Sequence, residues 1–238
     1  LTNDIKYYFI HTEDVQRMYV VVRLCGGLFA ALGVLCMYFV GCSLYNRTTG
    51  ILAALLFSIC PIVVVESHSF KPYAFFFPLM LMSIFFSSKI LNQDNKKNYV
   101  LAGLFAGLSI GTLVLSGTVI FTIVIAHILR KDKKTYLYKL SDKKLLLGLF
   151  ITIVTFILFN WYWIASLSEV IREYSHQAVI VPFTPSLKNW SHYIFRELPC
   201  GLGSGLSILG ISGIIFALYK RASSDILLLT CAIPYLLY

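Results

Sequence analysis

Charged side chains are scarce in this sequence of 238 residues: they make up 13% of it, where soluble globular domains have about 25%. Acidic residues are the rarer kind, with 11 Asp and Glu against 20 Lys and Arg. Hydrophobic residues, in contrast, make up 58% of the chain, and its mean hydropathy is +0.78. This composition excludes an ordinary soluble enzyme and a disordered chain, and it indicates a membrane protein.

Neither a cysteine framework nor a signal sequence is present. The six cysteines lie mostly in or beside apolar segments and form no CxxC pattern, so neither a disulfide scaffold nor a zinc site is indicated. Residues 1–18 are polar and of mixed charge, which excludes a cleavable signal peptide there. Because the chain begins at Leu1 and ends at Tyr238 within an apolar run, we expect it to be a piece of a longer protein.

Long apolar segments follow one another along the chain, and about 20 apolar residues suffice for one helical membrane span. The predicted fold is an all-α, polytopic transmembrane helical bundle of about eight spans, with short external loops and one longer external loop. The predicted spans are residues 19–45, 51–65, 73–88, two within 99–129, 145–167, 203–219, and one from 226 onward. Residues 1–18 are then the end of an external loop, and residues 19–238 are a transmembrane helical domain, incomplete at both ends.

The stretch 99–129 is too long for one ordinary span and short for two. Gly103, Gly107 and Gly111 recur every four residues and give it a small-residue face that lets helices approach closely. Ser116 and Gly117 offer a place for the chain to turn. We therefore predict two short, closely packed helices here.

The basic residues predict how the chain is oriented. Residues 130–144 contain seven Lys or Arg, the densest basic cluster, which the positive-inside rule places in the cytoplasm. The net charge of +9 is then mainly a topology signal, with basic loops facing anionic lipid headgroups, and no nucleic-acid partner is expected. We expect a multi-pass integral membrane protein, in the cytoplasmic membrane if the source is prokaryotic.

The external loop 66–73 concentrates ionisable groups between two short apolar segments. Ionisable groups near the membrane are costly and tend to face a cavity or a partner. Lys71 and His68 suit an anionic group such as a phosphate, while Glu66 can orient one of them, bind a sugar hydroxyl or act as a base. In the alternative interpretation, Glu66 and Lys71 merely pair with each other at the interface.

The long external stretch 168–202 is too large for a plain connector and is predicted to be an interfacial or re-entrant segment with aromatic anchors. Arg172, Lys188 and Arg196 are its candidate phosphate contacts, and a solvated loop is the alternative for each of them. His127 is a lone histidine without neighbouring metal ligands in the sequence, and we interpret it as an ordinary residue.

Several weak motifs occur in a familiar order. They are Arg23-Leu24, the turn Tyr45-Asn46-Arg47-Thr48-Thr49-Gly50, Pro61, the loop Glu66-Ser67-His68-Ser69-Phe70-Lys71-Pro72-Tyr73, and the glycine-spaced run from Leu101 to Thr112. In this order they resemble the polyprenyl-phosphate-sugar-dependent glycosyltransferases of the C superfamily. Relatives in that superfamily include the protein O-mannosyltransferases and the lipid A aminoarabinose transferase. The resemblance covers roughly residues 23–129, and the later segments agree only in topology.

This resemblance implies an integral-membrane glycosyltransferase that moves a sugar from a polyprenyl-phosphate donor to a protein, lipid or glycan acceptor on the external face. An acid would activate the acceptor, and cationic groups would stabilise the departing lipid phosphate. No cofactor is certain, and the hypothesis leaves room for a divalent metal ion. Membrane lipids are the remaining expected partners.

The resemblance also assigns roles to single residues. Where many family members have an acid after the proline of the second external loop, this chain has Tyr73, which becomes a candidate substrate-binding residue. Glu66 is the nearest substitute for that acid, and Lys71, with His68 and Arg196, is a candidate substrate contact. The family's catalytic acid follows the first span, so we expect it upstream of Leu1, with Asp14 as a candidate within this chain.

Two other classes of protein remain as alternatives. A transporter or flippase for a lipid-linked or anionic substrate would line its path with the polar groups of loop 66–73. Such proteins often carry inverted repeats with broken helices near the midplane, and we find no repeat between the two halves of this sequence. A non-catalytic membrane subunit is the third possibility.

Overall fold

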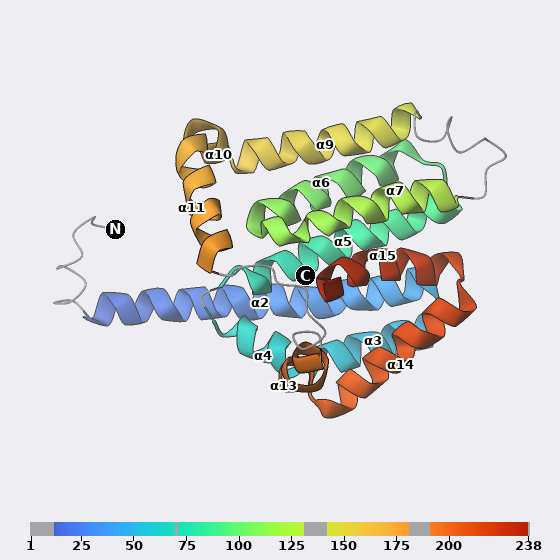
Figure 1. Ribbon diagram of the computed structural model, residues 1–238, viewed down its shortest axis with the longest axis horizontal. Coiled ribbons are helices and arrows are strands. Elements are labelled where there is room, and N and C mark those ends of the chain that lie inside the picture. Colours follow the sequence, from blue (N-terminus) through green and yellow to red (C-terminus); the bar gives the residue numbers. More distant parts are fainter. Residues whose placement is uncertain (1–11, 70, 131–141, 181–190, 238) are drawn as a thin grey trace.

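The computed structural model describes residues 12–69, 71–130, 142–180 and 191–237 (Figure 1). All regular structure in these ranges is helical, and no strand occurs in them, so the predicted all-α class is confirmed. The helices are α2 (Thr12–Leu44), α3 (Arg47–Ser58), α4 (Pro61–Ser67), α5 (Tyr73–Asn92), α6 (Lys96–Thr112), η1 (Val114–Thr118), α7 (Val119–Leu129), α9 (Lys143–Phe159), α10 (Tyr162–Ala165), α11 (Leu167–Ile180), η2 (Tyr193–Glu197), α13 (Leu198–Leu202), α14 (Ser204–Lys220) and α15 (Ser223–Leu237).

Helices α2, α5, α6, α7 and α9 run roughly along one axis, and α5 packs against α2, α6 and α7 (Figure 1). The buried core lies along these contacts, with Tyr99, Ile123 and Leu145 almost fully buried. The start of α2 projects beyond the other helices of the bundle, and α11 crosses the same end of the bundle at a steep angle to the common axis (Figure 1).

By length and apolar composition, two described helices can cross a membrane, Glu13–Leu44 and Tyr73–Asn92. The number rises to four if each of two bent helix pairs forms one span. The eight spans expected from the sequence therefore stay a prediction. The expected break within 99–129 is present, because α6 ends at Thr112 and η1 separates it from α7.

Several predicted segments have different bounds in the structure. The stretch 51–65 is not one straight helix: α3 and α4 meet at a bend of 59°, because Pro61 has no backbone N–H and keeps the preceding Cys60 extended. Helix α2 already begins at Thr12, within the stretch 1–18. Part of the long external stretch is also helical, since α11 covers Leu167–Ile180.

The four-residue glycine spacing predicts a close helix contact, which is present, but the glycine face of α6 packs against α9 and not against α7, the other helix of the predicted pair within 99–129. A Cβ atom on Gly103 would lie 2.2 Å from the carbonyl oxygen of Gly148, and one on Gly107 would lie 2.6 Å from that of Thr152. One on Gly111 would lie 2.3 Å from Asn160 Nδ2. Only glycine lets the two backbones approach this closely, so these residues set the distance between α6 and α9.

Candidate functional site

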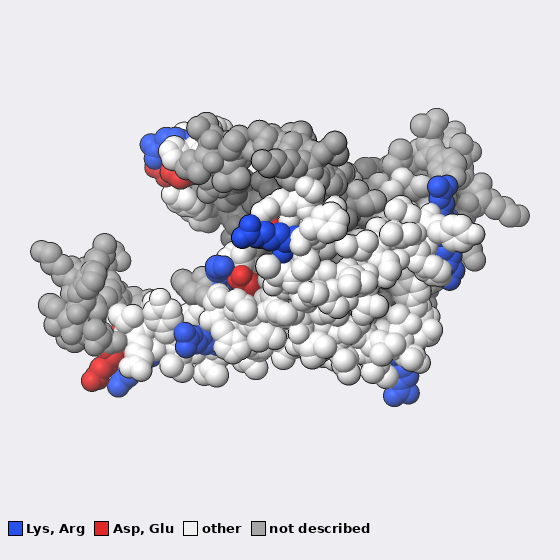
Figure 2. Space-filling model, turned by 60° about the horizontal axis from the view of Figure 1, so that its bottom comes forward, with Lys and Arg blue, Asp and Glu red and all other residues white. Residues whose placement is uncertain are grey.

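Charged side chains gather at the two ends of the bundle, and on the face shown in Figure 2 a wide uncharged surface separates them. We name the ends by the predicted orientation. The external end contains the start of α2, the loop between α4 and α5, and helices α10 and α11. The cytoplasmic end contains the start of α6, the end of α7 and the start of α9. Each end carries one cluster of ionisable side chains.

The external cluster is built on the short helix α4 and its contact with α2. Helix α4 ends at Ser67, and its backbone packs directly on α2, because a Cβ atom on Gly26 would lie 2.5 Å from the Ser67 carbonyl oxygen. Sequence reasoning did not single out Gly26. A glycine in the middle of an apolar helix was the available signal, since it often marks a close approach of another backbone.

Glu66 and Lys71 form the ion pair that the alternative interpretation of the loop expected. Lys71 Nζ donates to Glu66 Oε1 at 3.2 Å, and it also lies 5.9 Å from the centre of the Tyr73 ring. The two partners differ in exposure: the Lys71 side chain is 54% exposed, and that of Glu66 is 13% exposed. The lysine therefore reaches solvent, whereas the carboxylate is mostly covered.

The second oxygen of the Glu66 carboxylate has no partner among the described residues. Oε2 is buried and makes no hydrogen bond within the described part of the chain. A buried polar atom without a partner costs free energy comparable to a lost hydrogen bond, about 1–3 kcal/mol, and calls for an explanation. A carboxylate oxygen only accepts hydrogen bonds, so the group that would satisfy it is a donor such as a hydroxyl.

His68 is held by its own helix. Its Nδ1 lies 2.9 Å from both Ser67 Oγ and the Val64 carbonyl oxygen. These contacts orient the exposed ring at the end of α4, beside the start of the loop that carries Lys71. The structure thus joins Glu66 and Tyr73 through Lys71, and it places His68 at the start of the same loop.

Arg196 and Asp14 lie on other elements than that loop. Arg196 is exposed on η2, and the following α13 packs on the beginning of α4, with Gly203 near Pro61. Asp14 is half-buried in the first turn of α2. At 1.5 Å per residue it lies about 18 Å along the helix from Gly26. Their candidate roles stay predictions, and so does that of Lys188, which lies outside the described residues.

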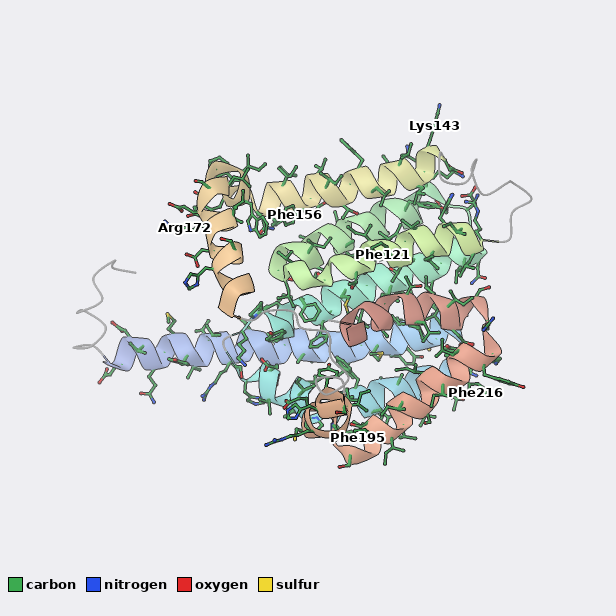
Figure 3. All side chains as sticks on the ribbon, in the orientation of Figure 1. Phe121, Lys143, Phe156, Arg172, Phe195 and Phe216 are labelled. Atoms are coloured by element: carbon green, nitrogen blue, oxygen red, sulfur yellow. The ribbon has the colours of Figure 1, made fainter. Side chains whose placement is uncertain are left out.

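An open hollow of about 300 Å³ lies beside α10 and α11 at the same end of the bundle. It is lined by Tyr162, Trp163, Glu169, Val170, Arg172 and Glu173. Arg172 extends from α11 on the side away from α6 and α7 (Figure 3). In the described ranges, no group of three His, Cys, Asp or Glu side chains is arranged to hold a metal ion.

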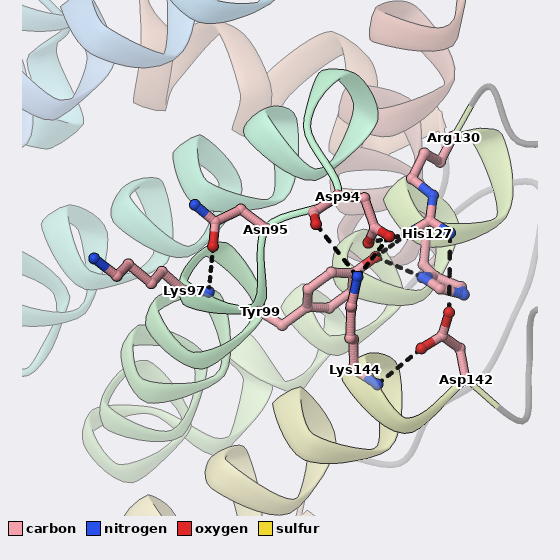
Figure 4. Close-up of polar contacts among 8 residues, drawn as sticks. All are labelled: Asp94, Asn95, Lys97, Tyr99, His127, Arg130, Asp142 and Lys144. Atoms are coloured by element: carbon pink, nitrogen blue, oxygen red, sulfur yellow. Dashed lines mark hydrogen bonds and ion pairs between the residues drawn. The ribbon is translucent and has the colours of Figure 1, made fainter.

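The cytoplasmic cluster joins four elements through a buried arginine (Figure 4). Arg130 is only 6% exposed; it pairs with Asp94 and donates to the Tyr99 hydroxyl at 3.0 Å. Asp142 lies 3.9 Å from its guanidinium. Tyr99 also lies 2.6 Å from Nδ1 of His127, which is fully buried and therefore part of this network. Lys144 Nζ donates to Asp94 Oδ2 at 2.6 Å, so carboxylates and cations are matched.

Such matched pairing indicates a structural role. Arg130→Ala would remove the hydrogen bond to the Tyr99 hydroxyl and the ion pairs with Asp94 and Asp142, but Asp94 is 42% exposed and keeps its ion pair with Lys144. The expected cost is therefore below about 3–5 kcal/mol, which is typical of breaking a fully buried ion pair. We expect Arg130→Ala to lower the unfolding temperature in detergent by several degrees. Lys143→Ala is the control, since Lys143 is exposed and points away from the bundle (Figure 3). Equal melting temperatures of the two variants would contradict this role.

Residues 15–182 match the family model described as dolichyl-phosphate-mannose-protein mannosyltransferase. The matched region runs from the first turns of α2 through α11 and includes the whole loop between α4 and α5. No curated protein and no solved structure matches the chain significantly.

Proposed function

Because the chain belongs to the dolichyl-phosphate-mannose-protein mannosyltransferase family, we propose that it moves a sugar from a polyprenyl-phosphate donor to a hydroxyl of an acceptor at the external membrane face. The family match supports membrane glycosyl transfer from a lipid-linked sugar. The external location and the roles of single residues are our own proposal. The loop between α4 and α5 forms part of the site.

The observation that carries this proposal is the unequal environment of the two Glu66 oxygens. Oε1 accepts a hydrogen bond from Lys71 Nζ at 3.2 Å, while the buried Oε2 accepts none from the described residues. A sugar or acceptor hydroxyl that donates to Oε2 would satisfy it. Lys71 is more than half exposed, so it can contact a phosphate of the donor while it remains near Glu66.

In the proposed reaction, the acceptor hydroxyl oxygen forms a bond to the anomeric carbon of the sugar. The bond between that carbon and the phosphate oxygen breaks, and its electron pair stays on the polyprenyl phosphate. The hydroxyl proton passes to the Glu66 carboxylate. Lys71 stabilises the negative charge that develops on the departing phosphate, and Tyr73 and His68 line the same loop.

The proposed acceptor is a protein hydroxyl, in keeping with the description of the family. Lipid and glycan hydroxyls are the other acceptors to be tested. The family match favours a transferase over the transporter or flippase considered from the sequence, because it concerns a group-transfer enzyme. The proposed reaction requires an acceptor hydroxyl and a lipid-linked leaving group, and it does not specify the sugar. The transfer assay identifies which sugar is used.

The test is transfer by the full-length protein in lipid vesicles. Radiolabelled polyprenyl-phosphate sugars and the matching nucleotide sugars are supplied in parallel, with a serine- and threonine-rich peptide, a lipid or a glycan as acceptor. We expect acid-resistant label on the peptide only from the lipid-linked donors. Label taken into the vesicles without a new glycosidic bond would overturn the proposal and favour a transporter. Transfer from nucleotide sugars without a lipid donor would also overturn it.

A further inference from the structure

Helix α11 has an apolar stripe along one side. Leu167, Val170 and Ile171 have the i, i+3, i+4 spacing that places residues on one helix face, and the sequence continues it at Tyr174 and Ala178. Glu169, Arg172 and Glu173 fall between them on the opposite side. The helix is therefore amphipathic, unlike α5 or α9, whose sequences are apolar all round.

The described part of the chain leaves this apolar stripe largely exposed. Leu167 is 54% exposed and Ile171 is 60% exposed. Among the described elements, α11 makes its main contact with α10, the four-residue helix that directly precedes it in the chain. An exposed apolar helix face on a folded protein marks an interaction surface, because exposure to water is unfavourable.

The direction of α11 suits a membrane surface. Its axis stands at a steep angle to α2 and α9, which run along the axis of the bundle (Figure 1). If the bundle crosses the bilayer, α11 lies close to the plane of that bilayer. Arg172 extends away from the bundle, so the polar side of α11 is turned outward (Figure 3).

The segment that leads into α11 also has exposed apolar and aromatic side chains. On α9, Phe150, Ile153 and Leu158 are exposed, as expected of a helix in contact with acyl chains. The exposed Trp161 and Tyr162 follow at the corner before α11. Tryptophan and tyrosine are enriched where acyl chains meet headgroups, so this corner lies at the depth of the membrane interface.

We propose that α11 is an interfacial helix that lies in the external leaflet, with Leu167 and Ile171 inserted among the acyl chains and Arg172 at the headgroups. Such helices bury their apolar face about 5–10 Å into the boundary between headgroups and acyl chains. Glu169, Arg172 and Glu173 together are slightly acidic, so attraction to anionic lipid is not the driving force. Apolar burial holds the helix at the surface.

Spin labelling of the full-length protein in nanodiscs of zwitterionic lipid tests this inference. A nitroxide is attached at Ile171→Cys or, as the matched control, at Glu173→Cys, after the exposed Cys25 and Cys200 are replaced by alanine. Collision with oxygen, which dissolves in lipid, is compared with collision with a water-soluble nickel chelate. We expect the ratio of oxygen to nickel collisions to be severalfold higher at 171 than at 173.

Each other outcome overturns the inference. Equal ratios at 171 and 173 would mean that α11 stands in water, free of the membrane. Low collision frequencies with both reagents at 171 would mean that protein covers the apolar stripe and that α11 covers a cavity of the bundle. The readout does not involve sugar transfer, so it remains valid if the proposed function fails. Both substitutions are at exposed positions, and size-exclusion elution of the labelled proteins checks their folding.

Discussion

The Glu66→Gln variant is expected to transfer sugar at least about a hundredfold more slowly than the wild-type protein, because a positioned general base contributes about 10²- to 10⁴-fold to a rate. Glutamine keeps the size of the side chain, and its amide oxygen can still accept from Lys71. It carries no charge, however, and cannot take the proton of the acceptor hydroxyl. The measurement is kcat at saturating donor, with the vesicle assay described above.

Three further variants separate catalysis from simple ion pairing. Lys71→Ala is expected to raise the donor KM and to lower kcat, and Lys71→Arg to restore most of the loss, since the charge contacts the donor phosphate. Glu173→Gln, on the exposed side of α11, is the matched carboxylate control and should behave as wild type. If Glu66→Gln kept the wild-type kcat, the Glu66–Lys71 pair would be only an interfacial ion pair.

The Gly103→Ala variant is expected to lose about 1–3 kcal/mol of stability, since inserting even one methyl group into a tight contact forces the backbones apart. The new Cβ would lie 2.2 Å from the Gly148 carbonyl oxygen, which belongs to rigid helix backbone. Neither partner can yield by rotating a side chain. Thermal unfolding in detergent, followed by circular dichroism, measures the loss.

Gly213→Ala in α14 is the matched control for this substitution. A Cβ atom there would have no neighbour within 4 Å, so only the helix propensity of alanine remains, and stability should stay equal or rise slightly. If the Gly103→Ala and Gly213→Ala proteins unfolded at the same temperature, α6 and α9 would not be packed at this distance. Sugar transfer by Gly103→Ala should fall only in proportion to the folded fraction.

The glycine spacing of 103, 107 and 111 shows how far local pattern reasoning reaches. A four-residue repeat of small residues predicts a close helix contact, and the structure confirms one. The sequence did not identify α9 as the partner, because the face that meets these glycines, around Gly148 and Thr152, has no matching signal of its own. The loop 66–73 was likewise found from its ionisable residues, but its catalytic and binding roles remain predictions.

The sequence by itself determined the class of protein, its helical fold and the break within 99–129, because these depend on composition and on local spacing. Scarce charge and long apolar runs require a helical membrane protein, and Ser116 and Gly117 lie at the break between α6 and α7. The bend before Pro61 was not predicted, since 51–65 was expected to be one span. Only the tertiary structure decided which distant residues meet. Arg130 is joined to Asp94 and Asp142, Gly26 lies against Ser67, and one oxygen of Glu66 has no partner within the described ranges. Such contacts depend on how helices pack in three dimensions, and single-sequence periodicity carries no information about that packing.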